Sequence, residues 1–473
     1  MKSSASVQKN TANVPANVNS ITEGVIWKQL LIFFFPILFG TFFQQLYNTA
    51  DAVIVGRFVG KEALAAVGGS TAILVNLLVG FFVGLSSGAT VIISQFFGAD
   101  NKQRVSEAVH TALAFAVVCG VIMMAFGLIC SEKVLRMMGT PETILADSVA
   151  YIHIFFCGII FNLIYNMGAG ILRAIGDSKR PLYFLIASCV TNIVLDIVLV
   201  VCLKMGVRGA AIATITSQLV SAVLVICVLL RADGSYRLEW RKIRMSPFIV
   251  VRIIQIGFPA GLQSVMYSAS NMILQSSVNA LGTNTVAAWT AYSKIDSVFW
   301  MIISALGISI TTFVGQNYGA GKIDRVKRGV YVCLGIAALI TVSLSTILYF
   351  CGSYIYLLFT MDSVVITLGT RVLRYLVPTF ICYISIEIFS GALRGIGDCW
   401  VPMMMTALGV CALRVVWILF AVPLRHNIIT VVTCYPLTWS VTSILFIIYY
   451  HWFSPLRRFQ IPLLQKKRKA KKV

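Results

Sequence analysis

Long apolar blocks dominate the chain, and short polar segments separate them. In the block from Ile186 to Val201, Asp196 is the only charged residue. Apolar runs of about 20 residues fit helices that cross a bilayer, whereas membrane-spanning strands would alternate between apolar and polar positions. Twelve such blocks are predicted to be spanning helices, at residues 28–56, 63–97, 106–130, 144–173, 181–203, 207–230, 249–280, 285–318, 328–351, 363–394, 401–422 and 428–452.

The composition agrees with an all-α polytopic membrane protein. Apolar residues make up 58% of the chain and charged residues 12%, about half the charge of an ordinary soluble domain. The net charge of +21 would suit a nucleic-acid partner, but its placement argues against one. The basic residues favour loops after even-numbered spans, for example Lys102 and Arg104 after the second and Arg241, Lys242 and Arg244 after the sixth.

This charge asymmetry predicts that both chain ends lie in the cytoplasm, because cytoplasmic loops carry the excess of Lys and Arg. Residues 1–23 are mostly polar and lack the apolar core of a signal peptide, so we expect a disordered cytoplasmic start. Residues 453–473 form a polybasic tail. Such a tail is expected to contact anionic membrane lipids weakly.

The chain contains an internal duplication. GILRAIGDSKRP (170–181) and GALRGIGDCWVP (391–402) share seven of twelve positions at an offset of 221, and SQFFGADNKQRV (94–105) pairs with GQNYGAGKIDRV (315–326) at the same offset. Each half holds six spans. An even number returns the chain to the same side, so the halves should be two six-helix bundles related by a pseudo-two-fold axis along the membrane normal. We predict lobes at 24–230 and 249–452, joined by a basic linker at 231–248.

Four acids lie inside predicted spans and away from the helix ends: Asp51, Asp196, Asp296 and Glu387. Charge in the apolar layer is costly, and such residues usually mark an ion or proton path. The alternative is an acid neutralised by a neighbouring cation, with a purely structural role. Arg414, in the eleventh span, is a candidate partner for Glu387 or Asp296.

Other polar residues are predicted to lie close to Asp51 and Asp196. Asn192 precedes Asp196 by four residues and shares its helix face, and Thr214 lies in the next span. Two carboxylates, an amide oxygen and a hydroxyl form a hard-oxygen set that suits Na⁺. The same set could carry a proton, because two neighbouring carboxylates readily share one. The residue types do not choose between the two ions.

Two prolines, Pro36 and Pro259, lie inside the first helix of each half. A proline there removes a backbone hydrogen bond and permits a bend. The bend can be static, or it can form and straighten during a transport cycle.

Enzyme signatures are missing from the sequence. GRFVGKE (56–62) has neither the spacing nor the Ser or Thr of a phosphate-binding loop, and there is no HExxH. The twelve cysteines form no CxxC pair. We therefore expect a transporter with no cofactor.

Several segments jointly resemble the multidrug and toxic compound extrusion (MATE) transporters of bacteria. They are the repeats above together with LIFFFPILFGTFFQQLYNTADAVIVGRFVGKEALAAVG (31–68) and AYSKIDSVFW (291–300). The resemblance implies a V-shaped pair of bundles in the inner membrane and efflux driven by Na⁺ or H⁺ entry. It also implies that Asp51, Asn192, Asp196 and Thr214 form an amino-lobe coupling-ion site.

The second half departs from relatives that couple through the carboxyl lobe. Such members tend to have an Asp where this chain has Tyr383, and Glu387 is the only acid in the tenth span. The coupling site is therefore predicted in the amino lobe alone. Residues of the second half are predicted to line the substrate cavity, namely Asp296, Glu387, Trp289, Tyr292, Tyr383 and Asn271.

The resulting hypothesis is a monomeric secondary antiporter that exports amphiphilic, mostly cationic compounds by alternating access. Its nearest alternative is a lipid-linked oligosaccharide flippase of the same superfamily, which should have a more cationic cavity. A membrane-embedded enzyme and a passive channel are further alternatives. An enzyme would need a nucleophile or metal constellation, and a channel would show no uphill transport.

Overall fold

The computed structural model describes residues 21–458, and every regular element within that range is helical. The predicted start (1–23) and tail (453–473) fall mostly outside these residues and stay predictions. Twelve helical segments are long and apolar enough to cross a membrane. The largest boundary error is at the third span, predicted to end at 130 and observed to end at Met137. The predicted all-helical, twelve-span fold is confirmed.

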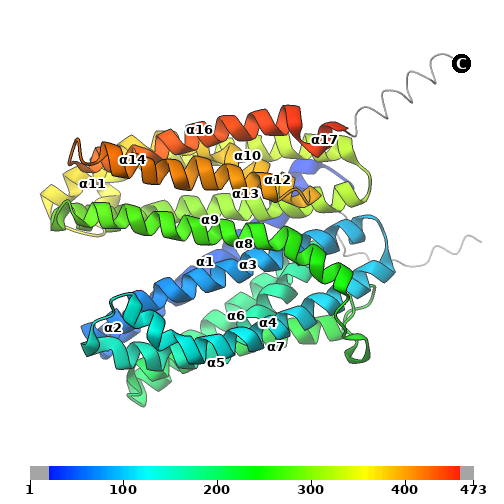
Figure 1. The fold of residues 1–473 in the computed structure, drawn as a ribbon, viewed down its shortest axis with the longest axis horizontal. Coiled ribbons are helices and arrows are strands. Elements are labelled where there is room, and N and C mark those ends of the chain that lie inside the picture. Colours follow the sequence, from blue (N-terminus) through cyan, green and yellow to red (C-terminus); the bar gives the residue numbers. More distant parts are fainter. Residues whose placement is uncertain (1–20, 459–473) are drawn as a thin grey trace, which may run out of the picture.

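The helices form two bundles, one for each half of the sequence. Figure 1 draws the bundle of the first half below the bundle of the second half. The first lobe consists of α1 (Ile26–Phe58), α2 (Lys61–Gly68), α3 (Ser70–Gly98), α4 (Lys102–Met137), α5 (Glu142–Ala174), α6 (Lys179–Asp196), the π-helix η1 (Ile197–Cys202) and α7 (Gly206–Leu230).

The second lobe repeats this order with more interruptions. It consists of α8 (Pro247–Asn279), α9 (Thr283–Gly319), α10 (Ile323–Leu357), α11 (Ser363–Leu376), η3 (Val377–Thr379), α12 (Phe380–Ile396), α13 (Trp400–Thr406), η4 (Ala407–Ala412), α14 (Leu413–Ala421), α15 (Ile428–Val432), α16 (Cys434–Ile448), η5 (Tyr449–Phe453) and α17 (Pro455–Arg458).

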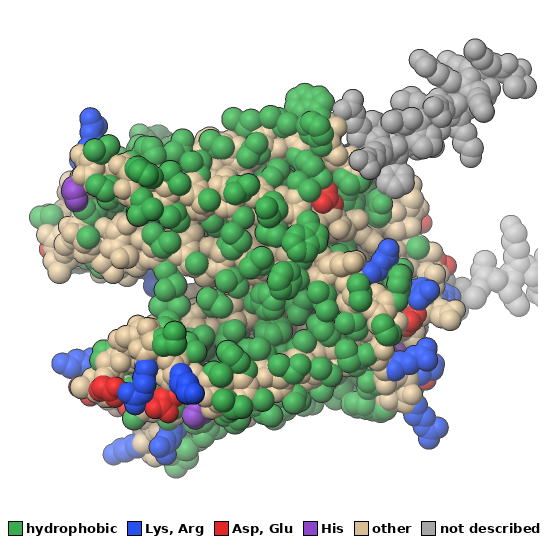
Figure 2. All heavy atoms as spheres, viewed as in Figure 1, with side chains coloured by type: hydrophobic (Ala, Val, Ile, Leu, Met, Phe, Trp, Pro, Cys, Tyr) green, Lys and Arg blue, Asp and Glu red, His purple; other side chains and the backbone are tan. Residues whose placement is uncertain are grey.

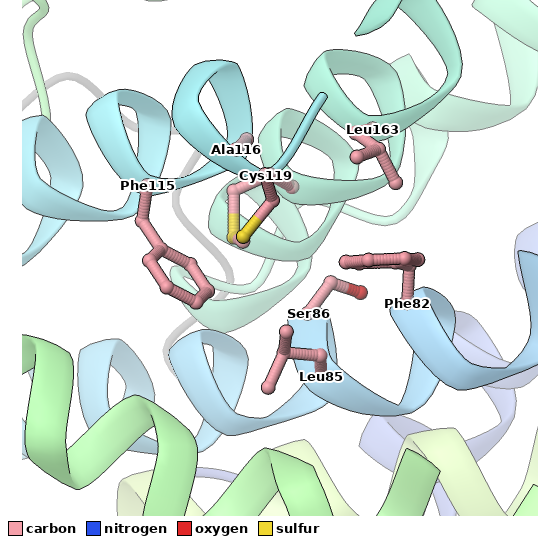
Figure 3. A pocket seen from close by; sticks show the side chains of 8 residues that line it. Phe82, Leu85, Ser86, Phe115, Ala116, Cys119 and Leu163 are labelled. Carbon is pink, nitrogen blue, oxygen red and sulfur yellow. The ribbon is translucent and has the colours of Figure 1, made fainter. Parts of the chain in front are cut away.

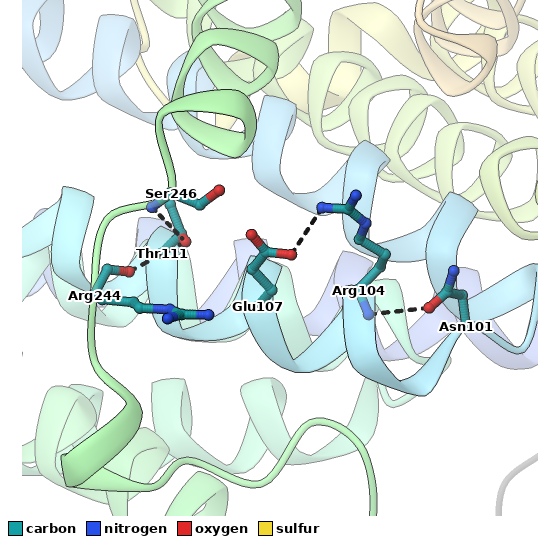
Figure 4. Close-up of polar contacts among 6 residues, drawn as sticks. All are labelled: Asn101, Arg104, Glu107, Thr111, Arg244 and Ser246. Atoms are coloured by element: carbon teal, nitrogen blue, oxygen red, sulfur yellow. Dashed lines mark hydrogen bonds and ion pairs between the residues drawn. The ribbon is translucent and has the colours of Figure 1, made fainter.

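The linker between the lobes carries a short 3-10 helix, η2 (Trp240–Lys242), and lies against α4. The Thr111 hydroxyl donates to the carbonyl of Arg244 and accepts from the amide of Ser246, both at 3.2 Å (Figure 4). His110 Nε2 accepts from the amide of Glu239 at 3.0 Å. These bonds fix the path of the linker beside a cavity of about 430 Å³ that it shares with α4. We call this end of the molecule the linker end and the opposite one the far end.

The two lobes exchange the beginnings of their first helices. Leu30, Phe33 and Phe34 of α1 are buried in the hydrophobic core of the second lobe. Reciprocally, Ile249 and Ile253 of α8 are buried in the core of the first lobe. Each lobe therefore holds the start of the other lobe's first helix at the linker end. The predicted lobe boundaries, which follow the sequence alone, do not include this exchange.

Beyond the exchange, each first helix returns to its own lobe. A Cβ added at Gly40 of α1 would meet Leu185 of α6, and Leu274 and Val278 of α8 lie in the second-lobe core. Pro36 in α1 and Pro259 in α8 lie near these crossovers. A proline removes a backbone hydrogen bond, so the helix can bend more easily at the point where it passes from one lobe to the other.

Glycines allow α3 and α8 to touch along the boundary between the lobes. A Cβ added at Gly84 would clash with the backbone at Gly261, and one at Gly257 would clash with the backbone at Leu85. The glycine contact between these helices that lies furthest toward the far end joins Gly80 to the hydroxyl of Ser264. Figure 2 shows a hollow between the lobes at the far end, on the left of the view. The lobes are thus closed at the linker end and open at the far end.

The duplicated segments themselves bind the lobes together. Gln95 Nε2 donates to the carbonyl of Gly395 at 2.9 Å, and Gln316 Nε2 donates to the carbonyl of Ala174 at 2.7 Å. Both glutamines and both carbonyls are related by the offset of 221 residues, since 95 + 221 = 316 and 174 + 221 = 395. We call this pair of bonds the glutamine clasp. It closes the linker end symmetrically.

Candidate functional site

Three helices of the first lobe bring the four predicted coupling residues into the interior. Asp51 comes from α1, Asn192 and Asp196 from α6, and Thr214 from α7. Asp51 is 8% exposed, Thr214 is 6% exposed, and Asn192 and Asp196 are fully buried. The helix α6 packs against both α1 and α7, so the predicted set lies on neighbouring helices. Asp51 and Asp196 lie near enough to act on each other electrostatically.

Most polar atoms of this set have no hydrogen-bond partner among the described residues. They are Asp51 Oδ1, both side-chain polar atoms of Asn192 and both carboxylate oxygens of Asp196. Unpartnered buried polar groups are costly, above all in a membrane, unless an ion, water or proton satisfies them. Among residues 21–458 no group of three or more His, Cys, Asp or Glu side chains could hold a metal ion. Carboxylate, amide and hydroxyl oxygens are hard donors, which suit a cation such as Na⁺, and the carboxylates can also hold a proton.

Tyr151 of α5 is a site residue that the sequence did not indicate. It is 7% exposed, and its hydroxyl lies beside Thr214 and within electrostatic range of Asp51 and Asp196. Thr214 also donates to the carbonyl of Ala210 at 3.0 Å. An aromatic residue in a spanning helix gives no sequence signal for this role. Only the packing of α5 against α7 brings its hydroxyl to the acids.

A π-helix begins directly after Asp196. The α-helical pattern of α6 ends at this residue, and η1 continues from Ile197 to Cys202. Short π segments inside spanning helices are frequent at functional sites, because the wider turn re-aims neighbouring side chains and frees a carbonyl. The π-helical backbone and the buried carboxylate therefore both indicate that Asp196 is a functional residue.

The two acids of the second lobe lie in different surroundings. Asp296 Oδ2 accepts from Trp300 Nε1 at 2.7 Å, and Asp296 Oδ1 has no partner among the described residues. Glu387 packs against Gly307 of α9 and lies beside Tyr383. The two acids form no joint cluster comparable with that of the first lobe.

Arg414 does not form the ion pair that the sequence suggested. Every ion pair within 4.0 Å in the described part of the chain joins exposed or half-exposed residues of loops and helix ends, and none includes Arg414. Arg414 Nη1 instead donates to Asn271 Oδ1 at 2.7 Å, and the guanidinium carbon lies 4.6 Å from the ring centroid of Tyr435. The pairing was wrong because the depth of a residue along a helix does not fix the direction of its side chain.

The predicted cavity aromatics are buried within the second lobe. Trp289, Tyr292 and Tyr383 are 5%, 2% and 2% exposed. Trp289 and Tyr292 stack at 4.9 Å, and the hydroxyls of Tyr383 and Tyr267 lie 3.1 Å apart. Their part in substrate binding stays a prediction.

A small cavity in the first lobe is no substrate site. It lies between α3, α4 and α5, and Figure 3 shows its mainly apolar lining around Ser86 and Cys119. Its volume of about 10 Å³ is room for one water molecule at most. A drug-sized molecule must therefore bind elsewhere, and the hollow between the lobes is the larger space.

Comparison with known proteins identifies relatives along nearly the whole chain. A family model described as MatE matches residues 36–198 and 259–420, one match in each lobe. The probable multidrug resistance protein YoeA of Bacillus subtilis is 30% identical over 455 residues, which are 93% of this chain and 97% of that protein.

Solved structures share the fold. The crystal structure of MATE in the straight conformation superposes with a TM-score of 0.86 at 23% identity, covering 95% of this chain and 99% of that one. The crystal structure of MATE in the bent conformation superposes with a TM-score of 0.84 at 22% identity, covering 94% and 98%.

Proposed function

Since the chain belongs to the MatE family of multidrug transporters, we propose that it is a secondary antiporter that exports amphiphilic, mostly cationic compounds in exchange for Na⁺ or H⁺. It is a multi-pass membrane transporter, and family membership makes it no enzyme. The coupled ion and the charge of the substrate are parts of the proposal. The comparisons do not favour a lipid-linked oligosaccharide flippase.

One observation carries the coupling mechanism. Asp51, Asn192 and Asp196 are buried in a membrane bundle with five polar atoms that lack partners among the described residues. A Na⁺ ion would be held by the oxygens of these residues and of Thr214. A proton would be held on one of the two carboxylates. Either ion neutralises charge that the apolar surroundings penalise.

One charge is enough to drive substantial export. An elementary charge that moves down 100 mV supplies about 2.3 kcal/mol. That energy supports roughly a fifty-fold concentration of a neutral substrate. A single coupling site, located in one lobe, is therefore enough to drive export.

The first helix can carry the signal from the ion to the substrate. Asp51 lies fifteen residues after Pro36 on the same helix, and the helix changes lobes near this proline. Ion binding at Asp51 would alter the angle between the two parts of α1, and hence between the lobes. Similar folds solved in a bent and a straight conformation support such a movement.

The basic residues of the loops support an orientation with the linker end in the cytoplasm. The basic linker lies at the closed end of the molecule, so the positive-inside rule places this end in the cytoplasm. We propose that the protein lies in the plasma (inner) membrane with both termini cytoplasmic, works as a monomer, and contacts lipid through its tail. The far-end opening then faces outward.

The test is Asp51→Asn in everted vesicles or proteoliposomes, with Na⁺ and pH gradients imposed separately. We expect loss of gradient-driven export of a cationic dye, with the protein still folded by size-exclusion chromatography. Glu62→Gln, at an exposed position near the far end, is the matched control and should export normally. Undiminished export by Asp51→Asn would refute the proposed coupling site, and the gradient that drives the wild type identifies the ion.

A further inference from the structure

The cavity between the linker and the beginning of α4 has a mainly cationic wall. The linker lines it with three cations, Arg241, Lys242 and Arg244, and the lining from α4 includes Ser106 and Glu107. We call this space the linker cavity. Its volume of about 430 Å³ lies in the range of small-ligand sites, about 300–1,000 Å³. Its size and charge therefore favour an anionic ligand.

The backbone that carries these cations is held at both ends. His110 Nδ1 lies 2.7 Å from the carbonyl of Ser106, so this nitrogen carries the proton and donates, and Nε2 accepts from the amide of Glu239 at 3.0 Å. On the other side of η2, the Thr111 hydroxyl donates to the carbonyl of Arg244 at 3.2 Å. Preorganised groups bind a ligand at a lower entropic cost. The cations between these anchors are thus already placed for binding.

Two of the three linker cations have no acidic partner. Lys242 Nζ lies 2.8 Å from a carboxylate oxygen of Glu239. Arg241 and Arg244 form no ion pair within 4.0 Å among residues 21–458. Arginine presents several donors in a planar fork that matches the oxygens of a phosphate group. The two free guanidinium groups therefore favour a phosphate over a smaller anion.

The acid in the lining is already neutralised. Glu107 Oε2 accepts from Arg104 Nη1 at 2.9 Å (Figure 4). Figure 4 also shows the side chain of Arg244 extending along α4 toward Glu107, with which it forms no ion pair within 4.0 Å. An anion in the linker cavity therefore meets an excess of positive charge.

Exposed aromatic side chains lie next to the residues of the linker cavity. Trp240, which precedes Arg241, is 64% exposed, and Phe248 at the start of α8 is 52% exposed. The guanidinium carbons of Arg104 and Arg252 lie 5.3 Å and 5.2 Å from the ring centroid of Phe248. Aromatic side chains beside basic ones are typical of the level of the lipid headgroups. A soluble anion would use only the cations, whereas a phospholipid would contact both groups.

We propose that the linker cavity binds the phosphate group of an anionic membrane phospholipid. The phosphate oxygens accept hydrogen bonds from Arg241 and Arg244, the rest of the headgroup occupies the cavity beside Ser106, and the acyl chains lie along Phe248 and the start of α8. In the orientation proposed above, the lipid comes from the cytoplasmic leaflet. The proposal depends on the membrane fold, and it is independent of the coupling site and of the exported substrate.

Lipid titrations of the purified full-length chain test the proposal. Native mass spectrometry of the chain released from detergent gives the dissociation constant of the first bound lipid, either anionic phosphatidylglycerol or zwitterionic phosphatidylcholine. The wild type should bind phosphatidylglycerol at least about tenfold more tightly. The double variant Arg241→Gln, Arg244→Gln loses the charged hydrogen bonds to the phosphate, so its affinities for the two lipids should differ less than about twofold.

Two further variants separate a site from diffuse attraction to a basic surface. The double variant Arg231→Gln, Arg328→Gln removes the same charge from exposed positions outside the cavity and should keep the preference of the wild type. Ser106→Phe leaves every charge in place and fills the cavity, so it should weaken phosphatidylglycerol binding at least about fivefold. Unchanged binding by Ser106→Phe would overturn the proposed site, as would equal losses in the two double variants.

The source of the phosphate is tested by competition. Glycerol 1-phosphate has the headgroup chemistry without acyl chains, and about a hundredfold excess should leave phosphatidylglycerol bound. Displacement by an equal concentration would show that the ligand is a soluble phosphate ester and would overturn the lipid assignment. If the cavity double variant does not fold, a wild type without a preference between the lipids refutes the proposal. Asp51→Asn should bind phosphatidylglycerol like the wild type, so a failure of the coupling proposal is distinguishable.

Discussion

The two lobes have the same helical order but carry their buried charged residues at different positions. At the repeat offsets of 223 and 221, Asp51 corresponds to Leu274, Asn192 to Leu413 and Asp196 to Trp417, since 51 + 223 = 274, 192 + 221 = 413 and 196 + 221 = 417. The ion-binding set of the first lobe is thus replaced by apolar and aromatic side chains. A duplicated scaffold can keep its packing while only one copy keeps the polar residues.

The second lobe has its own polar residues at other positions. Its buried cation, Arg414, corresponds to Ile193 in the first lobe, since 193 + 221 = 414. It is surrounded by aromatic rings, whereas the acids of the first lobe lie with an amide and two hydroxyls. The comparison suggests a division of labour in which one lobe binds the ion and the other binds the substrate. The following predictions test this division, from the largest expected effect to the smallest.

The largest difference between the lobes should appear when each loses one acid. Asp196→Asn should reduce gradient-driven export about a hundredfold or more, because the site loses a charge that binds the ion. Glu387→Gln should reduce it less than about threefold. Export rates in proteoliposomes at matched protein amounts measure both. Equal losses in the two variants would contradict a coupling site confined to the first lobe.

The contact between the lobes should be sensitive to the size of its glycines. Gly84→Val should reduce export at least about tenfold, because the added carbons meet the backbone at Gly261 and overpack the closed linker end. Gly335→Val is the matched control, since a Cβ at Gly335 meets no heavy atom within 4 Å. Normal export by Gly84→Val would show that this contact is not part of the transport cycle.

The two hydrogen bonds of the glutamine clasp should contribute equally to the stability of the far-end-open state. Gln95→Ala and Gln316→Ala each remove one hydrogen bond, worth about 0.5–1.5 kcal/mol. Each should therefore shift the equilibrium away from the far-end-open state about two- to tenfold, and by similar amounts. Distances between spin labels placed at Lys61 and Thr283, on exposed far-end positions of the two lobes, report the shift. A shift from only one substitution would break the proposed symmetry.

The smallest effect concerns the duplicated IGD motif. Asp177 caps α6 through the amides of Lys179 and Arg180, whereas Asp398 Oδ2 accepts from the Tyr449 hydroxyl at 2.6 Å. Burial raises the pKa of the Asp398 carboxyl, although the Tyr449 bond opposes this.

Folding therefore favours the protonated form of Asp398. The corresponding stability is present below the pKa of the unfolded chain, about 4, and is lost as pH rises through the raised value. Thermal unfolding of the wild type should shift down by about 1–2 °C across this window, and Asp398→Asn should remove that shift. A pH dependence that persists in Asp398→Asn would assign it to another group.

Much of the fold could be predicted because the lipid bilayer offers no hydrogen-bond partners to the protein backbone. A chain in a bilayer must satisfy its backbone internally, so each apolar block becomes a helix regardless of its neighbours. The duplication then divided the twelve spans into two halves of six. The same logic singled out Asp51 and Asp196, since a charge in an apolar block needs a reason to be there.

Side-chain partners could not be predicted in the same way. Tyr151 reaches the acids only through the packing of α5 on α7, and Arg414 lies against Tyr435 rather than against Glu387 or Asp296. Hydropathy fixes how deep a residue lies in the membrane but not the rotation of its helix. Partners far apart in sequence depend on that rotation.

The sequence by itself determined twelve helices, two equivalent halves and the positions of the buried acids, because local apolar length and internal repetition are written along the chain. The tertiary structure alone decided that the lobes exchange the beginnings of α1 and α8 and that Gln95 and Gln316 each bind the opposite repeat. It also decided that Arg414 binds Asn271 and Tyr435 and forms no ion pair within residues 21–458. The helix exchange and the glutamine clasp join residues more than a hundred positions apart, where packing and not hydropathy selects the contact.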